Sequence, residues 1–465
     1  MTRDPEALYA QALSRLSYTP TPDQDRVLRE LSAFAAAPGE RSVFVLNGYA
    51  GTGKTSLVGA LIAGMYDLKM RSTVLAPTGR AAKVAEKYSA RKASTVHRHI
   101  YRPVGDPNGA PQYALGKNNT RDTIYIVDEA SMVTDKGSKS MLRDLIKFIY
   151  SAPGCAMVLV GDEAQLPPVG QDDSPAMNTE LLRQLGLNPI YHTLREPARQ
   201  VAESGILHNA TSVRMQIEGG DISLPRLTTR GFPDVKVVSF YDFADEISTS
   251  WSQVGKEETI IITRSNRRAN DINMALRNQV MYAEEPLARG ERLVVSKNNY
   301  FWTRNMKNVT FLANGETVVV DWIGRLHKQY GLNFVDTELH IPGREDDIIA
   351  AKIMLRSLFT PGPSIPQAEM TELYRRAFAA HPGTISEQTM MALEDEYYNA
   401  LQVKYAYCVT CHKAQGGQWK HVYIDLSFLM LDMITDETFH RWLYTALTRA
   451  SEKIFFIHPS IPVEE

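Results

Sequence analysis

Eight residues, Gly48 to Thr55, restrict this chain to a small set of folds. They read Gly-Tyr-Ala-Gly-Thr-Gly-Lys-Thr and fit the pattern G-x-x-x-x-G-K-[ST] in full. The apolar run 43–46 before them predicts a buried strand, and residues 55–66 after them predict a helix. Such a turn cradles phosphate, because backbone N–H groups and the helix dipole face the anion. The sequence therefore predicts an α/β layer that binds a nucleoside triphosphate.

Length and composition set wide limits. The chain has 465 residues, which predicts two to four domains at about 100–200 residues each. No apolar run approaches the roughly 20 residues of a membrane span, and the polar start at Met1 has no signal-peptide core. We therefore expect a cytoplasmic protein, associated with the nucleoid, or with the host cytoplasm if the source is a virus. The net charge of −2 does not indicate a nucleic-acid partner, although a neutral protein can still carry a basic stripe.

The cysteines do not suggest a disulfide framework, because there are three of them, Cys155, Cys408 and Cys411. Residues 408–412 match the C-x-x-C-H pattern of haem attachment, but that chemistry belongs to exported proteins. A zinc site needs two more ligands at suitable spacing, and none is evident. We interpret these cysteines as small apolar residues of a strand.

Strands and helices alternate after the glycine-rich turn, which indicates a parallel sheet. A segment rich in Gly, Pro and Asn, residues 102–121, interrupts the first series and predicts an inserted loop or hairpin around Tyr113. A second α/β series starts near residue 191. The predicted strands are 73–76, 123–127, 156–160, 235–240, 258–263, 405–410, 421–425 and 453–457, and the predicted helices are 80–88, 138–150 and 267–280.

The second series is broken by a different pattern. Short strands separated by turns predict a small β-barrel over residues 290–342, with strands at 292–296, 309–312, 316–322 and 333–341. Residues 344–400 are predicted to be mostly helical, with a break at residues 361–363. The simplest interpretation is a second α/β domain that carries a β-plus-helical insertion.

Two acidic residues follow the strand at 123–127. Asp128 is placed to hold Mg²⁺, and Glu129 is placed to orient and activate an attacking water. The alternative is a solvated acidic strand end. Gln165, after the next strand, is placed to sense the γ-phosphate. A second carboxylate beside the first favours hydrolysis over mere storage of the nucleotide.

Three further residues are candidates for the same site. Arg199 and Arg449 are candidate arginine fingers, because a guanidinium stabilises the charge that spreads over the γ-phosphate oxygens. For a single arginine a surface ion pair is the usual alternative. Gln24 carries an amide that could pair with N6 and N7 of adenine, which favours ATP, but its residue type alone also fits a plain surface glutamine.

These motifs, in this order, resemble superfamily 1 helicases of the RecD/Dda-like, 5′→3′ branch, and the layout is most similar to that of the bacteriophage Dda-like members. The similarity runs from about Thr19 to Ile457 and is weakest at residues 102–121 and 343–400. The segments that carry it are TPDQ, GYAGTGKTS, APTGRAAK, STVHRHIY, VDEAS, GDEAQLPPV, LREPARQ, TCHKAQGGQW and YTALTRA.

The resemblance implies an α/β fold of two tandem RecA-like P-loop domains with a pin hairpin inserted in the first. It also implies an SH3-like β-barrel with a helical tower inserted in the second. The implied bounds are 1–101 and 122–190 for the first RecA-like domain, 102–121 for the pin, 191–287 and 401–465 for the second RecA-like domain, and 288–400 for the barrel and tower.

The resemblance also assigns residues to ATP, Mg²⁺ and DNA. The catalytic set is Lys54, Glu129, Gln165, Arg199 and Arg449, and Thr55 and Asp128 hold the metal. The nucleotide-binding residues are Gln24, Gly48, Ala50, Gly51, Thr52, Gly53, Lys54, Thr55, Ser56 and Gly416. The single-strand track is Pro77, Thr78, Thr95, His97, Thr410, His412 and Lys413, with Tyr113 as the strand-separating residue. For His97 a buried, hydrogen-bonded histidine is an equal alternative to a DNA contact, and for Tyr113 an aromatic residue that merely packs is the favoured alternative.

The functional hypothesis is an ATP-dependent DNA helicase that acts on single-stranded DNA and on junctions between single and double strands. A single-strand-binding protein and factors of DNA replication, repair or recombination are the other expected partners. Three alternatives stay open: a translocase that strips proteins without unwinding, a nucleotide-dependent recruitment factor, and a small-molecule P-loop kinase. The intact Glu129 disfavours the recruitment factor, and a kinase has no use for a second domain that ends in TALTRA.

Overall fold

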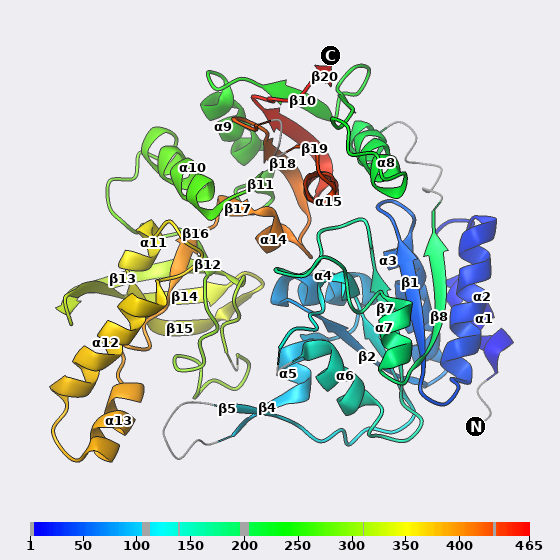
Figure 1. Ribbon diagram of the computed structural model, residues 1–465, viewed down its shortest axis with the longest axis horizontal. Coiled ribbons are helices and arrows are strands. Elements are labelled where there is room, and N and C mark those ends of the chain that lie inside the picture. The colour runs from blue at the N-terminus through cyan, green and yellow to red at the C-terminus, as the bar shows by residue number, and fades with distance from the viewer. Residues whose placement is uncertain (1–3, 105–111, 138–139, 196–203, 310, 431–433) are drawn as a thin grey trace.

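The computed structural model describes residues 4–104, 112–137, 140–195, 204–309, 311–430 and 434–465. Two parallel sheets and one antiparallel sheet form its framework. The first parallel sheet and the antiparallel sheet lie side by side, and the second parallel sheet lies above them in the view of Figure 1. Within these residues no helix is both long enough and apolar enough to cross a membrane.

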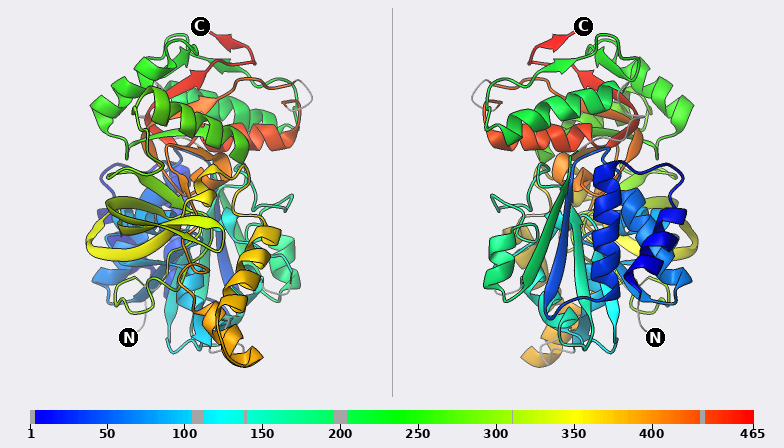
Figure 2. Two further views of the ribbon diagram at one scale, coloured as in Figure 1. Left: turned by 90° about the vertical axis from the view of Figure 1, so that its left-hand side faces the viewer. Right: turned by 90° about the vertical axis from the view of Figure 1, so that its right-hand side faces the viewer.

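The first parallel sheet has the strand order β3-β2-β6-β7-β1-β8. Every residue of β1, β6 and β7 is buried, as expected where helices cover both faces of a parallel sheet. One apolar cluster joins the sheet to α1, α2 and α3 through Leu8, Leu28 and Leu57, and another joins the opposite face to α6 through Leu142. Figure 2 shows these helices beside the sheet.

The predicted α/β patterning of this part is confirmed. Its strands are β1 (Ser42–Gly48), β2 (Arg71–Ala76), β3 (Ala93–Thr95), β6 (Thr123–Val127), β7 (Ala156–Gly161) and β8 (Asn188–Leu194). Its helices are α1 (Pro5–Ser14), α2 (Pro22–Ala36), α3 (Lys54–Asp67), α4 (Gly79–Ser89), α5 (Val96–Ile100), the 3₁₀ turn η1 (Ala130–Met132), α6 (Met141–Ile149) and α7 (Thr179–Gln184). Between α5 and β6 an antiparallel hairpin pairs β4 (Tyr101–Val104) with β5 (Gln112–Leu115).

The second parallel sheet has the order β10-β19-β18-β11-β17. Its strands are β10 (Val235–Val238), β11 (Thr259–Thr263), β17 (Cys408–Thr410), β18 (Trp419–Asp425) and β19 (Ala450–Ile457). Its helices are α8 (Gly205–Glu218), α9 (Phe243–Val254), α10 (Asn266–Gln279), α14 (Cys411–Ala414) and α15 (Glu437–Leu447), and β9 (Leu227–Thr228) pairs with β20 (Val463–Glu464). Cys408 lies in β17 and Cys411 opens α14; both are free and buried.

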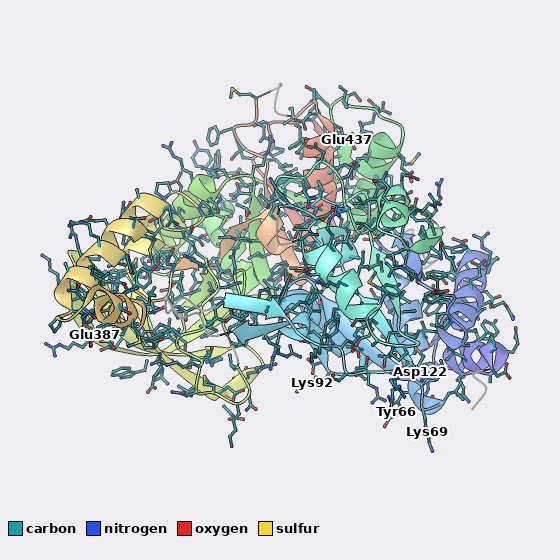
Figure 3. All side chains as sticks on the ribbon, turned by 60° about the horizontal axis from the view of Figure 1, so that its bottom comes forward. Tyr66, Lys69, Lys92, Asp122, Glu387 and Glu437 are labelled. Atoms are coloured by element: carbon teal, nitrogen blue, oxygen red, sulfur yellow. The ribbon has the colours of Figure 1, made fainter. Side chains whose placement is uncertain are left out.

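The antiparallel sheet lies between α10 and β17 along the chain and has the order β15-β14-β13-β12-β16. Helices α12 and α13 project from it. Figure 3 shows Glu387, on α13, and Tyr66, near the end of α3, toward opposite ends of the molecule. The elements are β12 (Arg292–Val295), β13 (Thr317–Gln329), β14 (Leu332–Ile341), β15 (Arg344–Met354), β16 (Val403–Tyr405), α11 (Arg356–Phe359), α12 (Gln367–Ala380) and α13 (Ile385–Leu393).

Two predictions for this insertion are wrong in detail. The sequence predicts helical structure from residue 344 onward, but residues 344–354 form strand β15, whose residues Ile349, Ala351 and Ile353 are buried in one apolar cluster. A strand was expected at 309–312, but in the described part of that segment the pairing is a single bridge between Asn299 and Leu312.

Candidate active site

The glycine-rich loop connects β1 to α3, as predicted. Gly51 and Gly53 have φ angles of 74° and 83°, a region that glycine tolerates without the clash of a side chain. Gly53 is also required by packing, since a Cβ there would lie 2.6 Å from Gln24 Nε2. Helix α3 begins at Lys54, and the N–H groups of its first turn have no acceptor within the helix. The loop is therefore a phosphate-binding turn.

Lys54 is bound to its own loop. Its Nζ donates to the carbonyl oxygens of Gly48 and Tyr49, the second at 3.0 Å, and lies 4.0 Å from Asp162 Oδ2. Burial lowers the pKa of Lys54, and the carboxylates of Asp162, Glu129 and Asp128 oppose that shift. The ammonium group thus faces the three carboxylates that line the same cavity.

A cavity of about 970 Å³ lies between the loop and the second parallel sheet. Residues from both sheets line it, so neither sheet forms the site alone. From the first part of the chain come Tyr18, Gln24, Ala50, Gly51, Gly53, Lys54, Thr55, Ser56, Asp128, Glu129, Asp162 and Gln165, and from the second come Ser204, Ile206, Leu207, Gly416, Gly417, Gln418, Thr448, Arg449, Ala450 and Ser451.

Asp128 and Glu129 follow β6 directly. Asp128 Oδ2 accepts a hydrogen bond of 2.9 Å from the Tyr88 hydroxyl, and Oδ1 accepts the N–H of Glu129, also at 2.9 Å. Burial, with the adjacent Glu129 carboxylate, raises the pKa of Asp128 above its usual range. Glu129 has φ 51°, a left-handed conformation uncommon outside glycine, and it lines the cavity.

Gln165 lies on the loop after β7. Its Nε2 is 3.4 Å from Asp162 Oδ2, and its Oε1 is buried without a hydrogen-bond partner in the described part of the chain. A buried acceptor without a partner is uncommon in folded proteins. The amide therefore retains an oxygen at the cavity that a ligand or a water molecule can satisfy.

Arg449 reaches the cavity from the second sheet, just after α15. It is 4% exposed, and its guanidinium donates to Thr445 O at 3.0 Å, Thr448 Oγ1 at 2.9 Å and Gly417 O at 3.3 Å. Its Nη1 lies 3.8 Å from Glu129 Oε1 on the opposite wall. The structure therefore brings this predicted arginine to the predicted base. Arg199 lies outside the described residues.

Gln24 lies at the cavity but is used within the fold. Its Oε1 accepts the Thr21 N–H at 3.0 Å, closing a capping box at the start of α2, and its Nε2 donates to Thr52 O at 2.9 Å. The residue is 1% exposed. One N–H and one oxygen lone pair of the amide remain for a nucleotide base, so adenine recognition by Gln24 stays a prediction. The bond to Thr52 O gives Gln24 a second role, which is to support the glycine-rich loop.

The residues predicted to track DNA divide between the two sheets. Thr78 and Thr95 cap α4 and α5, accepting the N–H groups of Ala81 and Arg98 at 3.2 Å each. These caps explain why hydroxyl side chains occupy both positions, whatever else they bind. Pro77 precedes Thr78 at the end of β2. Thr410 ends β17, His412 is exposed, and burial lowers the pKa of Lys413. The first set lies close to the loop that follows Lys413, since a Cβ on Gly416 would lie 3.3 Å from Thr78 Oγ1.

Tyr113 and His97 belong to one aromatic cluster. The Tyr113 ring lies 4.4 Å from Tyr300 and 5.5 Å from His97, and Tyr300 stacks on Phe311 at 4.9 Å. Burial lowers the pKa of His97. Tyr113 therefore packs against the loop before β13. The contacting residues Tyr300 and Phe311 were not predicted, although the aromatic run at 300–302 was a visible signal.

Several side chains that connect the two sheets have no predicted role. Tyr444 hydrogen-bonds Ala50 N and Asp162 Oδ2, and Thr445 accepts the N–H of Leu166 at 2.8 Å. Gln415 Nε2 donates to Leu166 O at 2.7 Å, and Arg441 donates to Glu163 O. Contacts between residues so far apart in the chain leave no local pattern in the sequence.

Taken together, the phosphate-binding turn, the acidic pair and the facing arginine define a P-loop nucleoside triphosphatase whose site is shared by two α/β layers. Family models agree with this class. An AAA domain matches residues 21–221, and a UvrD-like helicase C-terminal domain matches residues 405–457.

Individual relatives narrow the class. An uncharacterized protein of Acanthamoeba polyphaga mimivirus is 22% identical over 89% of this chain and 95% of its own length. The ATP-dependent RecD2 DNA helicase of Deinococcus radiodurans is 33% identical over 37% of this chain and 22% of its own, and the ATP-dependent DNA helicase dda of Enterobacteria phage T4 is 25% identical over 54% and 56%. The chain thus spans less than two thirds of either helicase. These comparisons confirm the predicted resemblance to superfamily 1 helicases of the RecD/Dda-like branch.

Proposed function

We propose that this chain is an ATP-dependent DNA helicase that moves 5′→3′ on single-stranded DNA and unwinds duplex DNA. The observation that carries the proposal is the composite cleft, in which Glu129 and Arg449 face one another from different sheets at 3.8 Å. A site completed by two layers changes when the layers move, and hydrolysis can therefore drive relative motion along a bound strand. The helicase names of the RecD2 and Dda relatives support DNA as the partner.

ATP is the proposed substrate, with its phosphates at the N-terminus of α3. Lys54 would exchange the carbonyls of Gly48 and Tyr49 for the β- and γ-phosphates. The donor set fits Mg²⁺, because the Thr55 hydroxyl and the Asp128 carboxylate both line the cavity and are the hard oxygen ligands that this ion prefers. When bound, Mg²⁺ neutralises charge on the phosphate oxygens.

Hydrolysis is assigned to residues of both walls. Glu129 orients the attacking water and accepts its proton while the bond from the γ-phosphorus to the bridging oxygen breaks, giving ADP and phosphate. Gln165 is assigned to sense the γ-phosphate. Arg449, with Arg199 as a second candidate, stabilises the charge that develops on the transferring group.

The single strand is proposed to cross from the first sheet to the second. Pro77, Thr78, Thr95 and His97 would contact it on one side, and Thr410, His412 and Lys413 on the other. Hydroxyls and backbone N–H groups suit phosphates, while basic and aromatic side chains add charge and stacking. Gly416 follows Lys413 by three residues and lies close to Thr78, which supports a continuous track across the two sheets.

The domain layout of the family is proposed for the remaining parts. Residues 1–101 with 122–190, and residues 191–287 with 401–465, would be the two RecA-like domains. The β4–β5 hairpin is the proposed pin, with Tyr113 at the point of strand separation. The antiparallel sheet is the proposed SH3-like barrel, and α12 and α13 are the proposed tower.

Steady-state ATP hydrolysis with and without single-stranded DNA tests the proposal. We expect strong stimulation by DNA, because closure of the cleft around ATP is coupled to the grip on the strand. A rate of ATP hydrolysis that does not change when DNA is added would contradict the helicase proposal. Binding of DNA and ATP with negligible hydrolysis would instead indicate a recruitment factor.

A further inference from the structure

One oxygen atom joins the second sheet to both phosphate-sensing loops of the first. The Tyr444 hydroxyl accepts the Ala50 N–H at 2.9 Å and donates to Asp162 Oδ2 at 2.7 Å. Tyr444 lies on α15, and both it and Asp162 are 1% exposed. The contact is therefore dry, and it connects the phosphate-binding loop, the loop after β7 and the helix that precedes Arg449.

Asp162 is the centre of this contact. Its Oδ2 receives the Tyr444 hydroxyl, lies 3.4 Å from Gln165 Nε2 and lies 4.0 Å from Lys54 Nζ. A buried carboxylate depends on its donors, because in low dielectric an unpaired charge is strongly unfavourable. A shift of Tyr444 therefore changes the environment of Lys54 and of Gln165, both of which are assigned to the γ-phosphate.

The same helix also places the arginine. Arg449 follows α15 by two residues, and its Nε donates to Thr445 O, one residue after Tyr444. Thr445 in turn accepts the N–H of Leu166 from the first sheet. Tyr444, Thr445 and Arg449 are therefore linked to one another at the C-terminal end of α15.

We propose that Tyr444 is a positioning residue that couples closure of the cleft to the arrangement of Lys54, Gln165 and Arg449 around the γ-phosphate. This inference rests on the proposed ATPase function and adds a role for a residue that touches neither the reacting atoms nor the metal ligands. Its hydroxyl holds α15 against the loop at Ala50, so that Arg449 faces Glu129 when the Tyr444–Asp162 bond is formed.

The variant Tyr444→Phe tests the role, because it keeps the ring and removes the bridging oxygen. We expect kcat of DNA-stimulated ATP hydrolysis to fall by about tenfold or more, while KM for ATP stays within about twofold or decreases, since the Ala50 N–H becomes available to a phosphate. The matched control is Tyr423→Phe. Tyr423 is also fully buried in the second sheet, but its hydroxyl bonds the Ser250 hydroxyl and the Glu246 carbonyl oxygen of α9, in the same part of the fold. We expect this control to retain the wild-type kcat.

A double-mutant cycle separates positioning from general loosening of the structure. If Tyr444 acts through Asp162, combining Tyr444→Phe with Asp162→Asn lowers kcat little beyond the slower single variant. Two results would overturn the inference and leave the proposed function intact. One is a double variant whose loss of kcat is the product of the two single losses, and the other is a Tyr444→Phe variant with the same kcat as Tyr423→Phe. Absence of DNA-stimulated turnover in the wild-type chain would overturn both.

Discussion

Arg449 Nη1 and Glu129 Oε1 lie 3.8 Å apart across the cleft between the two parallel sheets. The guanidinium is fixed from its own side by Thr445, Thr448 and Gly417, and Glu129 is fixed by the turn that ends β6. The distance between the two groups therefore depends on how the sheets sit relative to one another. Under the proposed mechanism, in which Glu129 is the base and Arg449 the stabilising cation, we therefore expect ATP hydrolysis to be sensitive to closure of the cleft.

Replacing Arg449 with Ala should leave nucleotide binding within a few-fold of wild type and lower kcat by about 10³–10⁵, the range for arginine fingers. The reason is that the transition state loses a cation while the phosphate-binding loop stays intact. Stopped-flow nucleotide binding and steady-state hydrolysis provide the two measurements. Arg230→Ala is the control, because Arg230 is an exposed partner of Glu464 in the same part of the fold. A change confined to KM would count against the assigned role.

Replacing Lys54 with Ala should abolish DNA-stimulated hydrolysis while binding of single-stranded DNA largely survives. Lys54 is the ammonium group at the phosphate-binding loop, whereas the residues assigned to the DNA track lie just before α4, at the end of β3, on α5, at the end of β17 and on α14. Fluorescence anisotropy with a labelled oligonucleotide measures the binding. Undiminished turnover in this variant would refute the site assignment.

The nucleotide half-site could be predicted because its chemistry is local in sequence. A strand, a glycine turn and a helix start within residues 42–67 fix Lys54 and Thr55, and an apolar strand followed by two carboxylates fixes Asp128 and Glu129. The cross-cleft bonds of Tyr444 could not be predicted, because Ala50 and Tyr444 are 394 positions apart and meet only in the folded chain.

The misassigned strand β15 illustrates a different difficulty. Its first residues, Arg344 to Asp347, are charged and exposed or half-buried, and its last four residues, 351–354, are all buried. Alternation of buried and exposed residues is therefore confined to residues 348–351, which is too short a stretch to predict a strand. Strand order in the antiparallel sheet depends on pairings such as β12 with β16, which local patterns do not encode.

Replacing Gln24 with Glu should raise KM for ATP by about tenfold and narrow the preference for ATP over GTP. The glutamate keeps an oxygen for the Thr21 N–H but loses both N–H groups of the amide. One of these N–H groups donates to Thr52 O, and the other is available to adenine N7. Competition between ATP and GTP in the hydrolysis assay measures the preference. A proportional loss for both nucleotides would assign Gln24 to loop support alone.

Replacing Arg277 with Met should destabilise the chain by about 3–5 kcal/mol, because it leaves the buried Glu291 carboxylate without its guanidinium. The two side chains are 2% and 0% exposed and 3.1 Å apart, and they tie α10 to the start of the antiparallel sheet. Thermal and urea unfolding measure the loss. Arg375→Ala, which breaks an exposed pair with Glu372 on α12, is the control and should cause no measurable change. Equal stability of the two variants would contradict the assignment of this ion pair as a structural link.

Unwinding of a partial duplex that carries either a 5′ or a 3′ single-stranded overhang tests the central claim most directly. With ATP and Mg²⁺, the wild-type chain should separate the 5′-overhang substrate and leave the 3′-overhang substrate paired, and Lys54→Ala should separate neither. Unwinding of the 3′-overhang substrate alone would contradict the proposed direction. DNA-stimulated hydrolysis with neither substrate unwound would contradict the helicase and identify a translocase.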